Sequence, residues 1–171
     1  LCILSAINVG AIGNLNELES LCDLSVRALD EIIELQDYPV KAAEVSTKSR
    51  RSLGIGYIGL AHYLAKNGVK YSDPKAWELV DRLSEAFQYY LLRASCDIAQ
   101  EKGKCEAFER TKYSDGLLPI DHYKKEVDEI VPHKQRMAWE TLRKDIGKHG
   151  LRHSTLSAQM PSESSSVVSN E

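Results

Sequence analysis

The sequence predicts an α/β fold, in which strands and helices alternate along one domain. The first observation is a short apolar run at the start, "LCILSAINVG", which is typical of a buried strand. The second is a series of segments whose apolar residues recur at helical spacing, bounded by Pro or Gly. The third is a strand-like run, "LRHSTLSAQMP", directly before a row of serines. These are too few strands to close a sheet, so we expect a helix-rich part of a larger fold.

The opening strand is predicted to run into a turn at Gly10 and Gly13. Asn14 is the predicted N-cap of the first helix, with Glu17 three residues later as in a capping box. Apolar residues at helical spacing then continue for roughly twenty residues, until Pro39 ends the pattern.

The next segment, "KAAEVSTKSRRSLGIG", is predicted to be a basic loop. Gly54, Gly56 and Gly59 imitate part of a dinucleotide-binding fingerprint, but no strand of adequate length precedes them. Close packing of the backbone is therefore the better interpretation of these glycines. Asn67 and Gly68 are typical of an ordinary helix end.

A long helix is predicted from Pro74, with Asp73 as its N-cap, to Gly103. Its apolar face is too extensive to stand alone, so it is expected to pack against a sheet or other helices. Residues 104–135 mix turns with a charged surface segment. "MAWETLRKDIGKHG" then predicts a helix that Gly150 ends, and "PSESSS" begins another.

The composition limits the classes of function. A formal charge of −3 gives no basic excess, so nucleic acid is not expected as a direct partner. The sequence has neither an apolar run of about 18 residues nor a signal-peptide pattern, so we expect no membrane span and a cytoplasmic protein. The chain opens with Leu1, in what reads as mid-strand, which favours a piece of a longer chain.

Cysteines and histidines give no metal site by spacing. The four cysteines are Cys2, Cys22, Cys96 and Cys105, and none forms a C-x-x-C pair. Cys22 and Cys96 fall on helical patterns and are predicted to be buried thiols, whereas the role of Cys2 is left open. His149 and His153 bracket a helix end, where capping and surface roles are favoured over a metal pair.

The run "MPSESSS" combines hydroxyl groups with the start of a helix. Pro161 suits a first helical turn, and the free backbone N–H groups there attract anions. The hydroxyls of Ser164, Ser165 and Ser166 can donate further hydrogen bonds without adding negative charge. A phosphate site and a simple serine-rich helix cap are both compatible with this pattern.

The string "LRHSTLSAQMPSESSS" resembles the loop of class I ribonucleotide reductase large (alpha) subunits that holds the diphosphate of the substrate. Other stretches resemble the same family in the same order, among them "LCILSAINVGAI", "RRSLGIGYIGLAHYLAKNGVKYSD" and "LPIDHYKKEVDEI". The resemblance covers the whole chain and is greatest to T4-like phage versions. It implies that residues 1–171 are an internal fragment, incomplete at both ends, of the catalytic ten-stranded α/β barrel domain.

The resemblance also assigns roles to residues. Cys2 matches a redox-active cysteine that forms a disulfide with a partner outside this chain as the ribose is reduced. Ser162, Glu163, Ser164 and Ser165 match the loop that binds the substrate phosphates, and no metal ligand is implied.

The implied function is the radical-based conversion of ribonucleoside diphosphates to deoxyribonucleoside diphosphates for DNA replication. No cofactor is expected to bind this chain directly. The radical would come from a metal-containing small subunit, the electrons from a thioredoxin or glutaredoxin-type reductant, and nucleotide effectors would bind outside this segment.

The expected partners are the substrate, the remaining large-subunit segments and the small subunit, in the cytoplasm of a bacterial host if the chain is phage-encoded. The family's radical cysteine would lie upstream of Leu1, so this chain alone is expected to be inactive. The alternative is a non-enzymatic remnant of a truncated or split gene.

Overall fold

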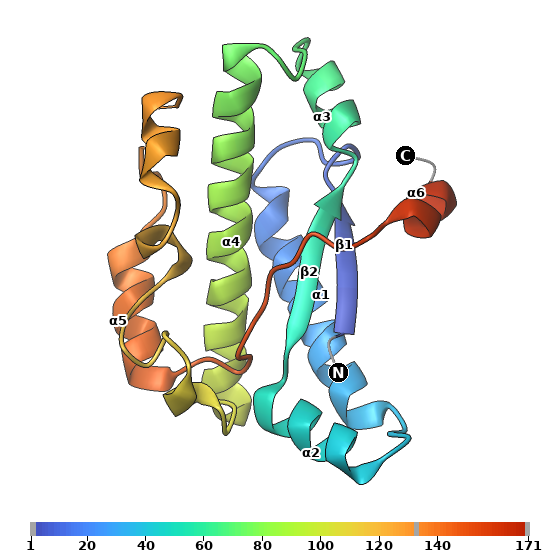
Figure 1. The fold of residues 1–171 in the computed structure, drawn as a ribbon, viewed down its shortest axis with the longest axis vertical. Helices are drawn as coiled ribbons and strands as arrows, with labels where there is room; N and C mark the ends of the chain where they lie inside the picture. The colour runs from blue at the N-terminus through green and yellow to red at the C-terminus, as the bar shows by residue number, and fades with distance from the viewer. Residues whose placement is uncertain (1–2, 132–133, 170–171) are drawn as a thin grey trace.

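Two parallel strands lie beside a set of helices in the computed structural model, which describes residues 3–131 and 134–169 (Figure 1). The elements are β1 (Ile3–Asn8), α1 (Glu17–Leu35), α2 (Lys41–Arg50), β2 (Leu53–Ile58), α3 (Leu60–Lys66), α4 (Pro74–Lys102), α5 (Trp139–His149) and α6 (Glu163–Ser169). Three 3₁₀ turns, Phe108–Arg110, Pro119–Asp121 and Lys125–Glu129, lie between α4 and α5. The predicted α/β class, rich in helix, is confirmed.

β1 and β2 pair in parallel over their full length, and residues 155–158 run beside the other edge of β2. The Ile55 N–H donates to the Leu156 carbonyl at 2.8 Å, and the Ala158 N–H donates to the Ile55 carbonyl at 3.1 Å. The short strand predicted here is thus reduced to a single parallel bridge between Ile55 and Ser157. Three neighbouring parallel segments are the arrangement expected of part of an α/β barrel.

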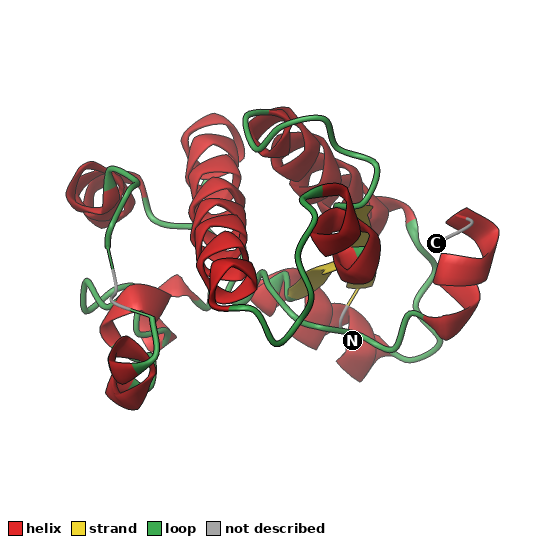
Figure 2. Cartoon of the chain, turned by 90° about the horizontal axis from the view of Figure 1, so that it is seen from above, coloured by secondary structure: helices red, strands yellow, loops and turns green. Residues whose placement is uncertain are grey.

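The core lies where α1 and α4 pack against each other and against the strands. From α1 it takes Leu18, Cys22, Val26, Leu29 and Ile33, and from α4 it takes Leu83, Phe87, Leu91, Leu92, Cys96 and Ile98. Most of these side chains follow one another at intervals of three or four residues, which is why the helical periodicity is visible in the sequence. Seen from above, α6 next to the C-terminus stands apart from these helices on an extended loop (Figure 2).

The start of α1 differs from the prediction by two residues. The N-cap is Asn16 rather than Asn14, and its side chain makes no capping hydrogen bond. The Glu17 carboxylate instead accepts from the backbone N–H groups of Gly13 at 3.0 Å and Asn14 at 3.1 Å. The glutamate half of the predicted capping box is therefore present, and it fixes the turn before the helix.

The predicted basic loop after Pro39 is wrong, because residues 41–50 form helix α2. The helix is stabilised by ion pairs from Glu44 to Lys41 at 2.8 Å and to Lys48 at 3.1 Å, which have the spacing of helical neighbours. It ends at Arg51, a residue in the left-handed region with φ of 49°. An L-residue adopts this conformation only with support, which Arg51 receives from its ion pairs with the buried carboxylate of Asp30 and with Glu34.

The other predicted helices are confirmed. α3 ends at Asn67, α4 begins at Pro74 after Asp73, and α5 ends at Gly150, whose φ is 77°. The glycine run itself forms strand β2. Within the described residues, no helix combines the length and apolar composition needed to cross a membrane.

Candidate functional site

The two faces of β2 have different environments. The Tyr57 ring packs edge to face against Phe87 of α4, with ring centroids 5.4 Å apart. Because side chains alternate along a strand, Leu53 and Ile55 share this helix-covered face, whereas Gly54 and Gly56 lie on the opposite face. On that opposite face, β2 therefore presents only backbone atoms at Gly54 and Gly56.

Residues 158–160 cross the glycine face between the third parallel segment and α6, and we call them the crossing segment (Figure 1). A Cβ atom built on Gly56 would lie 2.4 Å from the Ala158 carbonyl oxygen, 2.9 Å from Gln159 Oε1 and 3.0 Å from Met160 Cε. Real Cβ contacts are essentially never shorter than 3.0 Å. Only glycine at this position permits the crossing, which confirms close backbone packing at Gly56.

The four predicted phosphate-binding residues lie together, just before and within the first turn of α6. Ser162 is half-buried, and Glu163, Ser164 and Ser165 are exposed. Ser165 Oγ donates to the Ser162 carbonyl at 3.0 Å, and Ser166 Oγ donates to the Glu163 carbonyl at 2.8 Å. Among the described residues, the hydroxyl of Ser164 has no such intrachain partner.

This arrangement offers an anion several uncharged donors. The first N–H groups of a helix have no intrahelical acceptor, and the helix dipole adds a partial positive charge there. In the part of the chain that the structure describes, no Lys or Arg side chain hydrogen-bonds to Ser162, Glu163, Ser164 or Ser165. An anion here would be held by amides and hydroxyls. Cys2, the predicted redox residue, lies outside the described residues, so the structure does not place it relative to α6.

A buried charged cluster anchors the chain just before the third parallel segment. Asp30 of α1, 1% exposed, accepts hydrogen bonds from Arg51 Nε at 2.7 Å and Arg152 Nε at 3.3 Å, and its Oδ1 lies 3.1 Å from His153 Nε2. The other ring nitrogen of His153 lies 2.9 Å from the Ser95 hydroxyl of α4. Asp30 thereby ties the residues before the third parallel segment to α1, and Ser95 ties them to α4.

The environment of this cluster fixes its ionisation. Burial alone would raise the pKa of Asp30, but hydrogen bonds from His153 and Arg51 outweigh it and hold that pKa well below its usual range. Burial lowers the pKa of His153 despite the nearby carboxylate, with Arg51 and Arg152 acting in the same direction. His153 is therefore a neutral core residue at pH 7.

The surface role predicted for His153 is wrong, since its side chain is completely buried. Its partner Asp30 is 123 residues away in the sequence, and no local pattern connects the two. The cluster resembles a Ser–His–Asp arrangement in its contacts. Because the Ser95 and His153 side chains are both sealed in the core, the arrangement serves packing and has no access to a substrate.

The two cysteines predicted to be buried are buried. Burial raises the pKa of the Cys22 thiol to about 12 and that of Cys96 to about 11. Thiols of this kind have almost no thiolate at neutral pH and react slowly. Cys105 is buried as well.

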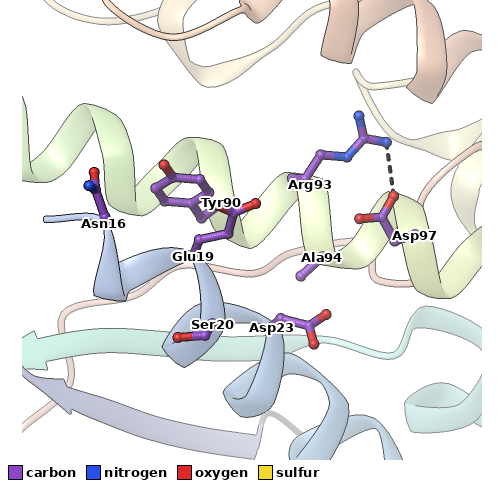
Figure 3. A pocket seen from close by; sticks show the side chains of 8 residues that line it. All are labelled: Asn16, Glu19, Ser20, Asp23, Tyr90, Arg93, Ala94 and Asp97. Atoms are coloured by element: carbon purple, nitrogen blue, oxygen red, sulfur yellow. Dashed lines mark ion pairs between the residues drawn. The ribbon is translucent and has the colours of Figure 1, made fainter.

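A separate pocket of about 370 Å³ lies between α1 and α4 (Figure 3). Its lining residues are Asn16, Glu19, Ser20, Asp23, Tyr90, Arg93, Ala94 and Asp97. Arg93 is already paired with Asp97 at 3.0 Å and with Asp145 at 2.7 Å. The pocket shares no residue with the serine loop, and its charges are largely neutralised within the chain.

Comparisons with known proteins point to one family. The family model described as "Ribonucleotide reductase, barrel domain" matches residues 1–171. The ribonucleoside-diphosphate reductase subunit alpha of Haemophilus influenzae is 58% identical over 170 residues, which are 99% of this chain and 22% of that protein.

Two further relatives carry the same name. The subunit alpha of Buchnera aphidicola subsp. Schizaphis graminum is 57% identical over 170 residues, again 99% of this chain and 22% of the relative. That of Enterobacteria phage T4 is 45% identical over 155 residues, 91% of this chain and 20% of the relative. The chain thus spans only about a fifth of the length of these relatives.

Proposed function

The chain belongs to the ribonucleotide reductase family, within the barrel domain of the large subunit, and from this premise we propose that it forms one wall of the active site of a ribonucleoside-diphosphate reductase. Its proposed part in the reaction is to bind the diphosphate of the substrate at Ser162–Ser165. We call these four residues the diphosphate cradle.

The course of residues 155–165 is the observation that supports the cradle most directly. This segment runs parallel to β2, passes over Gly56 and enters α6, whose first turn has backbone amides without intrahelical acceptors and several serine hydroxyls. In α/β folds, ligands bind beyond the carboxyl ends of the strands, which is where this turn comes in the chain. A diphosphate bound there gains charge-assisted hydrogen bonds from neutral donors.

In the proposed reaction a ribonucleoside diphosphate loses its 2′-hydroxyl as water. A thiyl radical elsewhere in the large subunit removes the 3′ hydrogen, and a pair of cysteines is oxidised to a disulfide as the sugar is reduced. Cys2 is proposed as one of this pair, with its partner outside the chain. The radical would originate in a metal-containing small subunit, and a thioredoxin or glutaredoxin-type dithiol would reduce the disulfide again.

Ser164→Ala in the full-length reductase tests the cradle. Its hydroxyl has no intrachain partner among the described residues, so the substitution removes no bond that stabilises α6. A hydrogen bond to a charged group contributes about 1.5–3 kcal/mol, which corresponds to a roughly 10- to 150-fold rise in the dissociation constant of a nucleoside diphosphate. Calorimetric titration with substrate measures it.

The control is Ser169→Ala, at the far end of α6, whose hydroxyl donates to the Ser166 carbonyl at 3.2 Å and to no other described residue. It should leave substrate affinity unchanged. Ser165→Pro should weaken binding more than Ser165→Ala, because it removes an amide donor as well as the hydroxyl. If Ser164→Ala and Ser165→Ala lower only the thermal stability and bind substrate as before, these serines are helix caps and the cradle is wrong.

A turnover assay tests Cys2 separately. Cys2→Ser should abolish repeated turnover with a dithiol reductant while substrate still binds. Cys22→Ser and Cys96→Ser are the matched controls, since both thiols are buried and unreactive, and they should affect stability alone. Loss of turnover in all three variants would remove the special role of Cys2.

Three narrower expectations stay predictions. These are membership in a T4-like phage type, effector binding outside this segment, and a location in the cytoplasm. The bacterial relatives at 57% and 58% identity share more of this sequence than the T4 subunit at 45%.

A further inference from the structure

We infer that Gly56 is a positioning residue for the diphosphate cradle: by having no side chain it lets residues 158–160 seat on β2, and this seat sets where the first turn of α6 lies. The inference rests on the proposed function, because it concerns the same phosphate-binding turn. Gly56 itself touches no substrate in this proposal.

The seat is tight, and the crowding involves the main chain. The nearest atom to a Cβ on Gly56 would be the Ala158 carbonyl oxygen at 2.4 Å, and a backbone atom cannot rotate away as a side-chain tip can. Any side chain at this position must therefore displace backbone by at least the 0.6 Å that separates 2.4 Å from the 3.0 Å limit. Either β2 or the crossing segment has to move.

β2 is the more firmly held of the two. It pairs with β1 along one edge and with residues 155–158 along the other, and its Leu53 and Ile55 side chains are 1% and 0% exposed in the core. The crossing segment is also fixed on its upstream side, since Ser157 Oγ donates to Gln88 Oε1 of α4 at 2.7 Å. A side chain at position 56 would therefore displace the part of the chain that follows Ser157.

Downstream of the seat the chain has little to resist such a shift. Only Pro161 separates Met160 from the cradle, and α6 is exposed along most of its length. A shift at Ala158–Met160 therefore moves the amides of Glu163, Ser164 and Ser165 relative to the strand ends. Binding sites work only when their donors are held to within about 0.5 Å of the productive geometry.

The proposed role predicts which kinetic constant changes, because the cradle holds only the diphosphate of the substrate. The diphosphate is a handle remote from the reacting carbons of the ribose, and it is bound equally in the ground state and the transition state. Loss of such uniform binding raises KM and leaves kcat unchanged. A purely structural glycine would instead lower the amount of active enzyme, which reduces kcat at constant KM.

Gly56→Ala in the full-length reductase is the test, with KM and kcat measured for a nucleoside diphosphate well below the melting temperature. We expect KM to rise about 10-fold, and towards 100-fold if the shift nears 1 Å, with kcat within about twofold. Gly147→Ala is the matched control, because a Cβ on this α5 glycine would meet nothing within 4 Å. It should leave both constants unchanged.

A second variant covers the case in which Gly56→Ala does not fold. The double variant Gln159→Ala, Met160→Ala removes the two side chains seated over Gly56 without adding an atom to β2, and it should also raise KM several-fold. Unchanged KM in folded Gly56→Ala, or in the double variant if the first is unfolded, overturns the inference. If Ser164→Ala weakens substrate binding while Gly56→Ala behaves like Gly147→Ala, the cradle stands and only the positioning role fails.

Discussion

At the scale of single residues, Asp30 is the carboxylate at the centre of the buried charged cluster. It is buried and accepts hydrogen bonds from Arg51, which follows α2, and from Arg152 and His153, two neighbouring residues after α5. A buried ion pair contributes little net stability when compared with apolar packing, but removing one partner leaves the others as uncompensated buried charges.

Asp30→Asn should therefore be severely destabilising, by about 3–5 kcal/mol. Urea unfolding of the chain at low protein concentration measures the change. The matched control is Glu101→Gln, which breaks the exposed pair between Glu101 and Arg27 at 2.7 Å. Exposed pairs are screened by solvent, so its effect should be much smaller. Equal losses in the two variants would contradict the central place of Asp30.

The same cluster predicts how stability depends on pH. The pKa of His153 is lowered in the folded chain, so below its ordinary value of about 6.5 the unfolded chain binds the extra proton. The free energy of unfolding should fall as the pH drops from about 7 to 5. The lowered pKa of Asp30 adds a second loss below about pH 4.

Unfolding midpoints measured across this range test the prediction. His153→Gln, which cannot titrate, should flatten the slope between pH 7 and 5. A wild-type chain equally stable at pH 7 and pH 5 would show that His153 is not held neutral by burial.

At the scale of elements, the start of α5 depends on one carboxylate of α4. Glu85 accepts hydrogen bonds from the backbone N–H of Arg136 at 2.7 Å and of Met137 at 3.2 Å, and from the Trp139 indole at 3.0 Å. Its side chain is only 4% exposed, so water does not replace these bonds readily. The carboxylate thus fixes the residues that lead into α5 against α4.

Glu85→Ala should cost about 1–3 kcal/mol for each buried donor left unpaired and should loosen the beginning of α5. Hydrogen exchange over residues 136–142 should become much faster, while exchange in the middle of α1 changes little. Glu140→Ala is the control, because this side chain is 73% exposed and, among the described residues, forms an ion pair with Arg143 alone. Unaltered protection in the Glu85 variant would refute the role of the carboxylate.

The elements also show which parts of the fold are readable in the sequence. α1, α4 and α5 were predicted because each buries one face, and burial leaves a period in the apolar residues. α2 was missed because Thr47 alone is buried there and the helix depends on charge pairs of Glu44. β2 was interpreted only as packed backbone, since its glycines hide the strand pattern.

The candidate site was predictable to a different degree. The serine row was recognisable as a helix start, and the structure places Ser162–Ser165 together there. The anchor formed by Asp30 and His153 was not, because residues 123 positions apart meet only through the tertiary fold. Gly56 was noticed for its backbone, but its neighbours at 158–160 lie about a hundred positions further along the sequence.

At the scale of the whole molecule, several apolar side chains point to solvent. Leu24 and Leu35 of α1 are 65% and 81% exposed, and Leu4 of β1 is 51% exposed. In the described part of the chain, β1 pairs with a strand on one edge only. Exposed apolar faces and open strand edges both promote association.

We therefore expect the isolated 171-residue chain to self-associate as its concentration rises, which sedimentation velocity measures. The double variant Leu24→Lys, Leu35→Lys should shift the distribution towards monomer, because charge on α1 opposes contact between apolar faces. A variant with Ser46→Lys on α2 adds charge without removing apolar surface and serves as the control. A chain that stays monomeric at high concentration would contradict the expectation.

The bridge between Ile55 and Ser157 also affects the order in which the segments can pair during synthesis. During synthesis β1 and β2 are made together within residues 3–58, whereas the segment that pairs with the second edge of β2 is made about a hundred residues later. Chains are made at roughly 5–20 residues per second, so this delay lasts several seconds, far longer than hairpin or helix formation. Gly56 must therefore stay uncovered on the nascent chain until residues 158–160 have been made.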